Sequence, residues 1–527
     1  MYTHRISACL AILIGLVLSS SLQAQNNPSI KLVENHKEWG WDSWVMQNGL
    51  ITLATTPVIG ARIMQYDLGS HSSIFVNPDE LGKTYTPQSN SQWPNFGGFK
   101  NWPAPQSNWN WPPPPTLDFG LYEAVIDSTK NDTVSISVTS PIEQWRAKDL
   151  RFKRTTSLYK GSSRVTVEQT IINEGDANQE WSVWDVTQNI TNHPGETDFE
   201  NFWVYFPINP DSEFGNDGVK LSAASDAWIG EVAPGIYGVQ FKPEAKKIFA
   251  DSHIGWIAYT DERDGYVYAK TFDIDEGAQY PDDGARVEVW INNDPYYLEV
   301  EVLSPIVNLS ANGGSYTFTE DWWAAKIDSG PVLSVTNAGA VTRFEYLEAI
   351  GRLSASFGVF HDAYARLEYL DNQGALVTST DTVKVTPLET FMYDEPFSAL
   401  ENADSVRMVL VDADLNQIGV LITESVETLL TSSELIDNIP GEFQLSQNYP
   451  NPFNPSTNIS YSLPRATQVT IEVFNMLGQS VSVLENSLKT QGQHTVRFDA
   501  KNLTSGVYLY QIKAEGFIQT RKMMLIK

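Results

Sequence analysis

The chain is poor in cysteine, with only Cys9 among its 527 residues. Cys9 precedes most of the apolar run near the N-terminus, which is not where a lipid-carrying cysteine is placed. The rest of the chain has no thiol, which excludes disulfides, cysteine nucleophiles and thiolate metal sites. A fold without disulfides depends on the size of its core, and a length of roughly three or four domains allows a large one.

Positive charge is also scarce. Lys and Arg number 35 against 64 Asp and Glu, which gives a formal net charge of −29. Binding to a phosphate backbone or to anionic lipid requires a basic surface, so neither nucleic acid nor a membrane surface is expected as a partner. With 42% hydrophobic and 19% charged residues, the composition is that of a folded chain.

Long hydrophobic runs are limited to one, Ala8–Leu18. It follows the charged start Met1–Arg5 and precedes small and polar residues that end at Ala24. This order predicts a secretory signal peptide, residues 1–24. The run is too short to cross a bilayer and no other stretch approaches ~20 apolar residues, so we expect no membrane span and a location outside the cytoplasm.

Tryptophan is confined to one part of the chain, since all 16 lie between Trp39 and Trp323. This change in composition predicts a domain boundary near residue 330. The mostly polar residues 431–447 predict a linker, because the alternating prolines and asparagines that follow at 448–455 cannot continue a helix or a central strand. We therefore expect domains at 25–330, 331–430 and 448–527.

Most patterned segments are typical of β-strands. Residues 133–138, 165–170, 287–291 and 297–302 largely alternate in polarity and are rich in β-branched and aromatic residues. Gly, Asn and Asp interrupt them at short intervals. No amphipathic helix longer than two or three turns is evident before residue 330. The sequence predicts an all-β chain, with a large antiparallel sandwich followed by two small β-sandwich domains.

The last part of the chain contains the run Asn-Tyr-Pro-Asn-Pro-Phe-Asn-Pro at 448–455, Leu-Gly-Gln at 477–479 and Gly-Val-Tyr-Leu-Tyr at 506–510. These motifs resemble the C-terminal sorting domain of type IX secretion cargo. The resemblance implies passage across the outer membrane, recognition by the secretion machinery, and release or attachment at the cell surface. An exposed final strand is suited to pairing with such a machine. The alternative is an ordinary adhesive sandwich.

A second resemblance covers roughly residues 40–325. It rests on 48–63, where a strand, a glycine turn and an arginine-bearing strand follow one another, on Phe-Gly-Gly-Phe-Lys-Asn-Trp at 96–102, and on the strands at 297–309. These segments are similar to galactose-mutarotase-like proteins of an uncharacterised bacterial branch. The resemblance implies a supersandwich fold.

Aromatic and amide side chains gather near residue 100, where Trp93, Trp102, Trp109 and Trp111 are interleaved with Asn, Gln and Lys. The prolines of this segment predict a long loop over one face. Aromatic rings suit the faces of sugars and polar groups suit their edges. The alternative is a hydrophobic cluster that fixes the loop to the sheet. The predicted substrate-binding residues are Arg62, Trp93, Lys100, Asn101, Trp102, Trp109, Trp111, Arg146 and Trp184.

In mutarotases a Glu acts as the base and a His as the acid, so the resemblance implies a glutamate on a late strand. Glu299 and Glu301 are two residues apart on a predicted strand and share a face, and Glu288 lies on a neighbouring strand. His193 and His253 are the candidate acids. The paired histidine motifs and the Asn-Arg pair of the family are not recognisable. The alternative is a row of exposed acidic residues.

Two further features concern ligand charge. Arg62, Lys100 and Arg146 could meet uronate or sulfate groups, or pair with the abundant acidic residues. The acidic turns 273–277 and 412–416 offer oxygen ligands to Ca²⁺, although neither has a full loop pattern, and no other cofactor is expected.

These features predict a secreted protein that binds or processes carbohydrate, with bond cleavage left open. The alternatives are a polysaccharide lyase or glycoside hydrolase acting on acidic polysaccharide, and a non-catalytic surface or adhesive protein.

Overall fold

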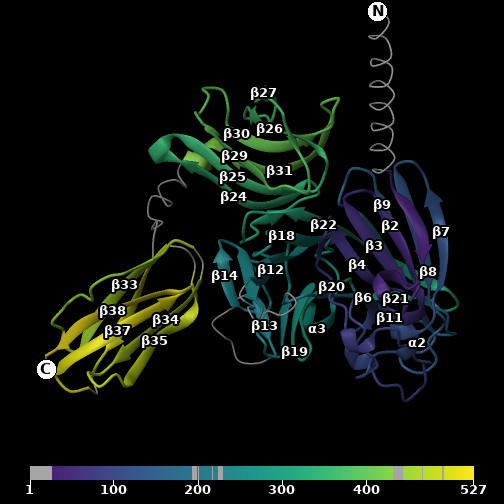
Figure 1. Cartoon of the computed structure of the whole chain (residues 1–527), viewed down its shortest axis with the longest axis horizontal. Helices are drawn as coiled ribbons and strands as arrows, with labels where there is room; N and C mark the ends of the chain where they lie inside the picture. Colours follow the sequence, from purple (N-terminus) through teal and green to yellow (C-terminus); the bar gives the residue numbers. More distant parts are fainter. Residues whose placement is uncertain are drawn as a thin grey trace, which may run out of the picture.

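The computed structural model describes residues 27–192, 199, 201–215, 218–222, 229–430, 443–465, 467–489, 492–501 and 503–526. The predicted signal peptide, His193 and most of the predicted linker lie outside these residues. Figure 1 shows a large β-sandwich in purple to teal, a second one in green and a third one in yellow. In the described part of the chain the α-helices before residue 330 are α2 (Pro115–Phe119) and α3 (Pro281–Gly284), so the expected lack of long helices is confirmed there.

The large sandwich consists of two antiparallel sheets. The first sheet has 12 strands, in the order β1 (Ser29–Val33), β2 (Ser43–Gln47), β3 (Ile51–Thr56), β4 (Arg62–Leu68), β6 (Phe99–Ala104), β11 (Gln179–Asn189), β20 (Tyr296–Leu303), β19 (Val287–Asn293), β16 (Lys246–Ala250) and β13 (Val219–Leu221), with β5 (His71–Ser72) beside β4 and β21 (Val307–Leu309) beside β11.

The second sheet has 10 strands, in the order β14 (Ile229–Ala233), β15 (Ile236–Gln240), β12 (Phe202–Pro207), β17 (Trp256–Asp261), β18 (Tyr266–Phe272), β22 (Gly314–Lys326), β10 (Val165–Asn173), β9 (Leu150–Tyr159), β8 (Thr133–Thr139) and β7 (Glu123–Thr129). One core joins the two sheets, because it includes Val300 of the first and Trp322 of the second. The predicted large antiparallel sandwich is confirmed.

Because side chains alternate along a strand, the first sheet has one face toward the core and one face away from it. On β20, Leu298, Val300 and Val302 point into the core between the sheets. Glu299 and Glu301 therefore lie on the opposite face, which we call the outer face of the first sheet.

The second sandwich has a four-stranded and a five-stranded sheet. The strands are β23 (Ser334–Val335), β24 (Gly339–Leu347), β25 (Arg352–Val359) and β29 (Phe391–Pro396) in one, and β27 (Leu376–Ser379), β26 (Ala363–Leu370), β30 (Ser405–Val411) and β31 (Gln417–Ser425), with β28 (Val383–Val385) beside β26, in the other. They enclose a core of their own.

The third sandwich is built in the same way around a separate core. Its three-stranded sheet contains β32 (Gln444–Leu445), β33 (Ser456–Leu463) and β36 (Gly492–Asp499), and its four-stranded sheet contains β35 (Ser480–Lys489), β34 (Thr467–Phe474), β37 (Gly506–Ala514) and β38 (Phe517–Leu525). Two small β-sandwiches thus follow the large one, as predicted.

The expectation that the whole proline-rich segment around residue 100 is a loop is wrong for β6, which pairs with β11 from Phe99 to Ala104. Pro103 is tolerated because β6 pairs with β4 only at Phe99, so on that side Pro103 has no strand partner that would need its missing N–H. Trp102 is consequently a strand residue. Irregular structure does follow, with a 3₁₀ turn at Gln106–Asn108.

The glycine pair before β6 has a steric reason. Gly97 and Gly98 have φ values of 88° and 74°. A Cβ on Gly97 would lie 2.2 Å from the carbonyl oxygen of Phe75, and one on Gly98 would lie 2.6 Å from Sδ of Met64. Only glycine fits both the backbone conformation and the space, so this pair lets β6 enter the sheet beside β4.

Candidate functional site

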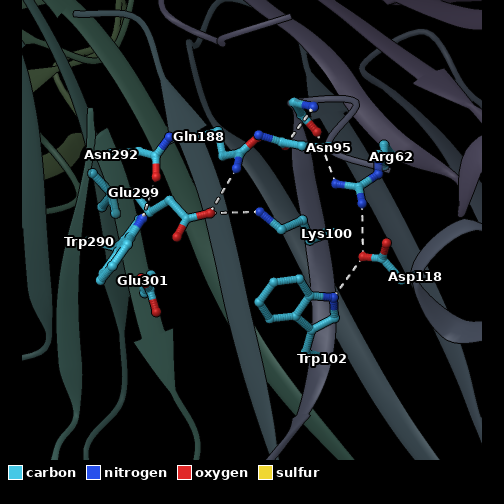
Figure 2. A network of polar contacts seen from close by, with 12 residues as sticks. Arg62, Asn95, Lys100, Trp102, Asp118, Gln188, Trp290, Asn292, Glu299 and Glu301 are labelled. Carbon is cyan, nitrogen blue, oxygen red and sulfur yellow. Dashed lines mark hydrogen bonds and ion pairs between the residues drawn. The ribbon is translucent and has the colours of Figure 1, made fainter. Parts of the chain in front are cut away.

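The outer face of the first sheet carries a connected set of polar and aromatic side chains (Figure 2). Register places them as neighbours, with Trp102 opposite Trp184, Gln188 opposite Glu299 and Trp290 opposite Glu299. The set comprises Arg62 of β4, Lys100 and Trp102 of β6, Trp184 and Gln188 of β11, Glu299 and Glu301 of β20, Glu288 and Trp290 of β19, and Lys247 of β16.

Glu299 lies at the centre of this set. Its Oε1 accepts hydrogen bonds from Nζ of Lys100 at 2.8 Å and from Nε2 of Gln188 at 2.9 Å. Its side chain keeps 8% exposure, against 1% for that of Lys100. Burial lowers the pKa of Lys100, although the charge of Glu299 acts in the opposite direction. Both contacts fall on one carboxylate oxygen, which leaves the second oxygen of Glu299 outside this network.

Two more carboxylates lie deeper on the same face. Nζ of Lys247 is 2.6 Å from Glu288 and also contacts Glu301, which accepts a further hydrogen bond from the indole of Trp184 at 2.6 Å. Burial raises the pKa of Glu301 and raises that of Glu288 well above its usual value, against the attraction of Lys247. One lysine cannot neutralise both carboxylates, so the arrangement favours a proton on one of them.

The tryptophans near residue 100 form a packed cluster. The ring centroids of Trp102 are 5.3 Å from those of Trp184 and 6.0 Å from those of Trp93, and Trp93 is 5.1 Å from Trp111. Trp102 and Trp109 are buried and Trp93 is half-buried, whereas Trp111 is 54% exposed. Packing therefore accounts for Trp102 and Trp109, and only Trp93 and Trp111 of the four offer ring surface to a ligand.

The predicted cations are engaged by the protein itself. Arg62 forms a fully buried ion pair with Asp118 at 2.8 Å, and Asp118 also accepts from the indole of Trp102 at 2.7 Å. Nη1 of Arg146 donates to the carbonyl of Pro112 at 2.9 Å. Arg62 and Lys100 are thus paired with acidic residues, whereas Arg146 is bonded to a neutral carbonyl.

Two other predicted residues lie apart from this set. Asn101 points between the sheets, where it donates to Gln169 and accepts from Arg154. His253 lies in the β16–β17 connection, and no hydrogen bond or ion pair among the described residues joins it to Glu288, Glu299 or Glu301. His193 is outside the described residues. The structure thus brings the predicted glutamates together without a histidine described beside them.

Sequence reasoning missed Trp290, Lys247, Gln188 and Asp118. Trp290 is two residues after Glu288 on β19, so the two side chains share a face. The alternation of side chains along a strand could therefore have identified Trp290 from the sequence. Lys247 joins the set only because β16 pairs with β19, a relation that spans a long connection.

The proposed calcium turns use their carboxylates internally. Oδ1 of Asp412 accepts from the backbone of Asp414 and Asn416, and Oδ1 of Asp275 accepts from that of Gly277. In the described part of the chain, one cluster, His71 with Asp261 and Asp264, has ligand-type atoms within 4.8 Å of one another. Calcium binding stays a prediction.

Comparisons with known proteins found similar solved structures and one matching sequence family. No curated protein matches it. Similar solved structures include a candidate aldose 1-epimerase from Klebsiella pneumoniae, at 11% identity and a TM-score of 0.41 over 58% of this chain and 85% of that one. Another is a galactose mutarotase-like protein from Clostridium acetobutylicum, at 8% identity and a TM-score of 0.36 over 57% of this chain and 98% of that one.

A TPR-domain containing protein from Parabacteroides distasonis is also similar, at 12% identity and a TM-score of 0.38 over 56% of this chain, and the match spans 49% of that protein's length. Galactose mutarotase-like proteins are thus among the similar solved structures.

The C-terminal part has a sequence match of its own. Residues 447–527 match the family model of the secretion system C-terminal sorting domain. No helix within the described ranges has the length and apolar character of a membrane span. Residues 447–527 therefore form a type IX sorting domain, which implies secretion or attachment at the cell surface.

Proposed function

We propose that this chain is an exported protein that binds glycans outside the cell and acts on them at the outer face of its first sheet. The observation that carries the proposal is the pairing of Trp290 with Glu299 on adjacent strands. Trp290 is half-buried, so part of its ring is available for the face of a sugar, and Glu299 can accept from a hydroxyl at the sugar's edge.

The chemistry of the face supports processing as well as binding. Lys100 and Gln188 hold one oxygen of Glu299, and the other oxygen is the candidate base. The pKa values of Glu288 and Glu301 are raised, mainly by burial, so this pair is the candidate store of a proton. A carboxylate oxygen that can accept a proton, near a buried pair of carboxyl groups with raised pKa values, is an arrangement suited to acid–base catalysis.

A lyase or hydrolase for acidic polysaccharide receives no comparable support. Such an enzyme needs a cation that is free to neutralise a uronate. Arg62 and Lys100 are instead buried against Asp118 and Glu299, and the half-buried Arg146 donates to the carbonyl of Pro112 outside the set on the outer face. The remaining alternative is a surface protein without catalytic activity. The experiment below distinguishes it from the proposed function, because it measures product formation as well as binding.

The test uses the full chain in affinity gels containing single polysaccharides, followed by product analysis. We expect Trp290→Ala to weaken retention by about tenfold or more, as for loss of an aromatic anchor. Glu299→Gln should keep binding and lose turnover. Trp44→Ala, which alters another half-buried tryptophan of the same sheet, is the control for stability. Unchanged retention in Trp290→Ala would contradict the binding site, and binding by the wild type without any product would contradict processing.

A further inference from the structure

The segment that joins β5 to β6 forms a hollow together with Phe119 of α2. The hollow has a volume of about 600 Å³, within the range of roughly 300–1,000 Å³ found for small-molecule pockets. The base of the segment is tied by a hydrogen bond from Nδ2 of Asn77 to the carbonyl of Asn95 at 2.7 Å, and by a β-bridge between Val76 and Gly97. These contacts hold the two ends of the segment together.

Its lining combines aromatic rings with neutral polar groups. Tyr85 stands edge-on to Phe119, with ring centroids 6.5 Å apart. Three residues with amide side chains, Gln88, Asn90 and Gln92, line the same hollow. Apolar ring surface next to amide donors and acceptors suits a ligand with C–H faces and hydroxyl edges.

Trp93 connects this hollow to the candidate site. It lines the hollow, and its ring lies 6.0 Å from that of Trp102 and 5.8 Å from Nζ of Lys100. Its indole Nε1 is covered and has no hydrogen-bond partner in the described structure. A ligand hydroxyl that reached this nitrogen after a small shift would add a hydrogen bond without displacing one.

The charge of the lining restricts the ligand. Among the described residues that line the hollow, Glu80 is the charged one, and it accepts a hydrogen bond from the hydroxyl of Tyr85 at 2.9 Å. No basic side chain lines it in the same set, and Lys83, which lies 3.6 Å from Glu80, is paired with that carboxylate. A uronate or sulfate would be bound without a counter-charge, next to a carboxylate and on a chain of net charge −29.

We infer that this hollow is a subsite for an uncharged sugar residue, so that the protein selects neutral over acidic glycans. The inference rests on the proposed function, because Trp93 is the wall shared by the subsite and the candidate site. A bound chain would place one neutral residue between Tyr85 and Trp93 and the next toward Trp290 and Glu299.

The test compares retention of the full chain on galactomannan, β-glucan and polygalacturonate. The variant Gln88→Ala/Gln92→Ala removes two amides from exposed positions, where substitution costs little stability. We expect it to bind the neutral polymers about tenfold more weakly, in line with the loss of two hydrogen bonds. The control is Gln373→Ala/Gln417→Ala, at exposed positions of the second sandwich, which should bind as the wild type.

The outcomes separate the two proposals. Retention of the wild type by the neutral polymers and its loss in the Gln88/Gln92 variant support the subsite. Stronger retention on polygalacturonate overturns neutral selectivity. Equal binding by variant and wild type, with binding lost in Trp290→Ala, overturns the subsite and leaves the proposed function standing. A wild type that binds none of the three polymers, nor any other glycan tried, overturns both.

Discussion

At the scale of single residues, Lys247 faces two buried carboxylates with one positive charge. Burial raises the pKa of Glu288 and of Glu301 above their usual values. A carboxyl group with a raised pKa binds more protons in the folded than in the unfolded state. The folded state therefore loses stability as the pH rises above the unfolded value of ~4.3.

Replacing Glu288 by Gln removes one of these groups. We expect the free energy of unfolding of Glu288→Gln, relative to the wild type, to increase as the pH rises from about 4 toward neutrality. Urea unfolding across this range measures it. Glu168→Gln, at an exposed position of β10, should show no such trend. A Glu288→Gln difference that stays constant with pH would contradict the raised pKa.

Single residues also show where prediction from the sequence stops. Alternation along one strand was sufficient to place Glu299 and Glu301 on the same face. Their partners could not be predicted, because Lys100 and Glu299 are 199 residues apart in the chain. Asn101 was misplaced for another reason. Its segment was expected to be a loop, whereas it is part of β6, where adjacent residues such as Lys100 and Asn101 point to opposite faces of the sheet.

At the scale of elements, the short helix α2 is fastened to two strands by one side chain. Asp118 accepts from Arg62 of β4 and from Trp102 of β6, and it has no exposed surface. This contact fixes the tryptophan cluster against the sheet. Proline content alone suggested a loop for this region, and the pairing that makes β6 a strand depends on β11, which is about eighty positions later in the sequence.

The corresponding prediction is that Asp118→Asn destabilises the protein by about 3–5 kcal/mol, because it leaves the buried guanidinium of Arg62 without a counter-charge. The measurement is urea unfolding of the full chain. The double variant Arg62→Met/Asp118→Leu, which removes both charges, should recover most of the loss. A cost for Asp118→Asn below about 1 kcal/mol, the range of an exposed ion pair, would contradict this role.

At the scale of the whole molecule, three sandwiches follow one another, each with a hydrophobic core of its own. This order was predictable because composition and strand periodicity are local properties. The confinement of tryptophan to the first part of the chain agrees with the large first core, which holds Trp322 between the sheets, and with the packing of Trp102 against Trp184 on the outer face.

Separate cores predict that the sorting domain is dispensable for folding. A chain ending at residue 430 should unfold at the same urea concentration as the first two sandwiches of the full chain. In cells with type IX secretion it should remain inside the outer membrane. Fractionation with antibody detection measures its location, and wild-type levels of the truncated chain in the medium would contradict the role of residues 447–527.

The most direct measurement is a crystal structure of the full chain with a neutral oligosaccharide that binds it in solution. We predict a sugar ring stacked on the indole of Trp290, with a hydroxyl within roughly 2.6–3.2 Å of Glu299. An oligosaccharide bound at another surface, with the outer face of the first sheet empty, would contradict the account.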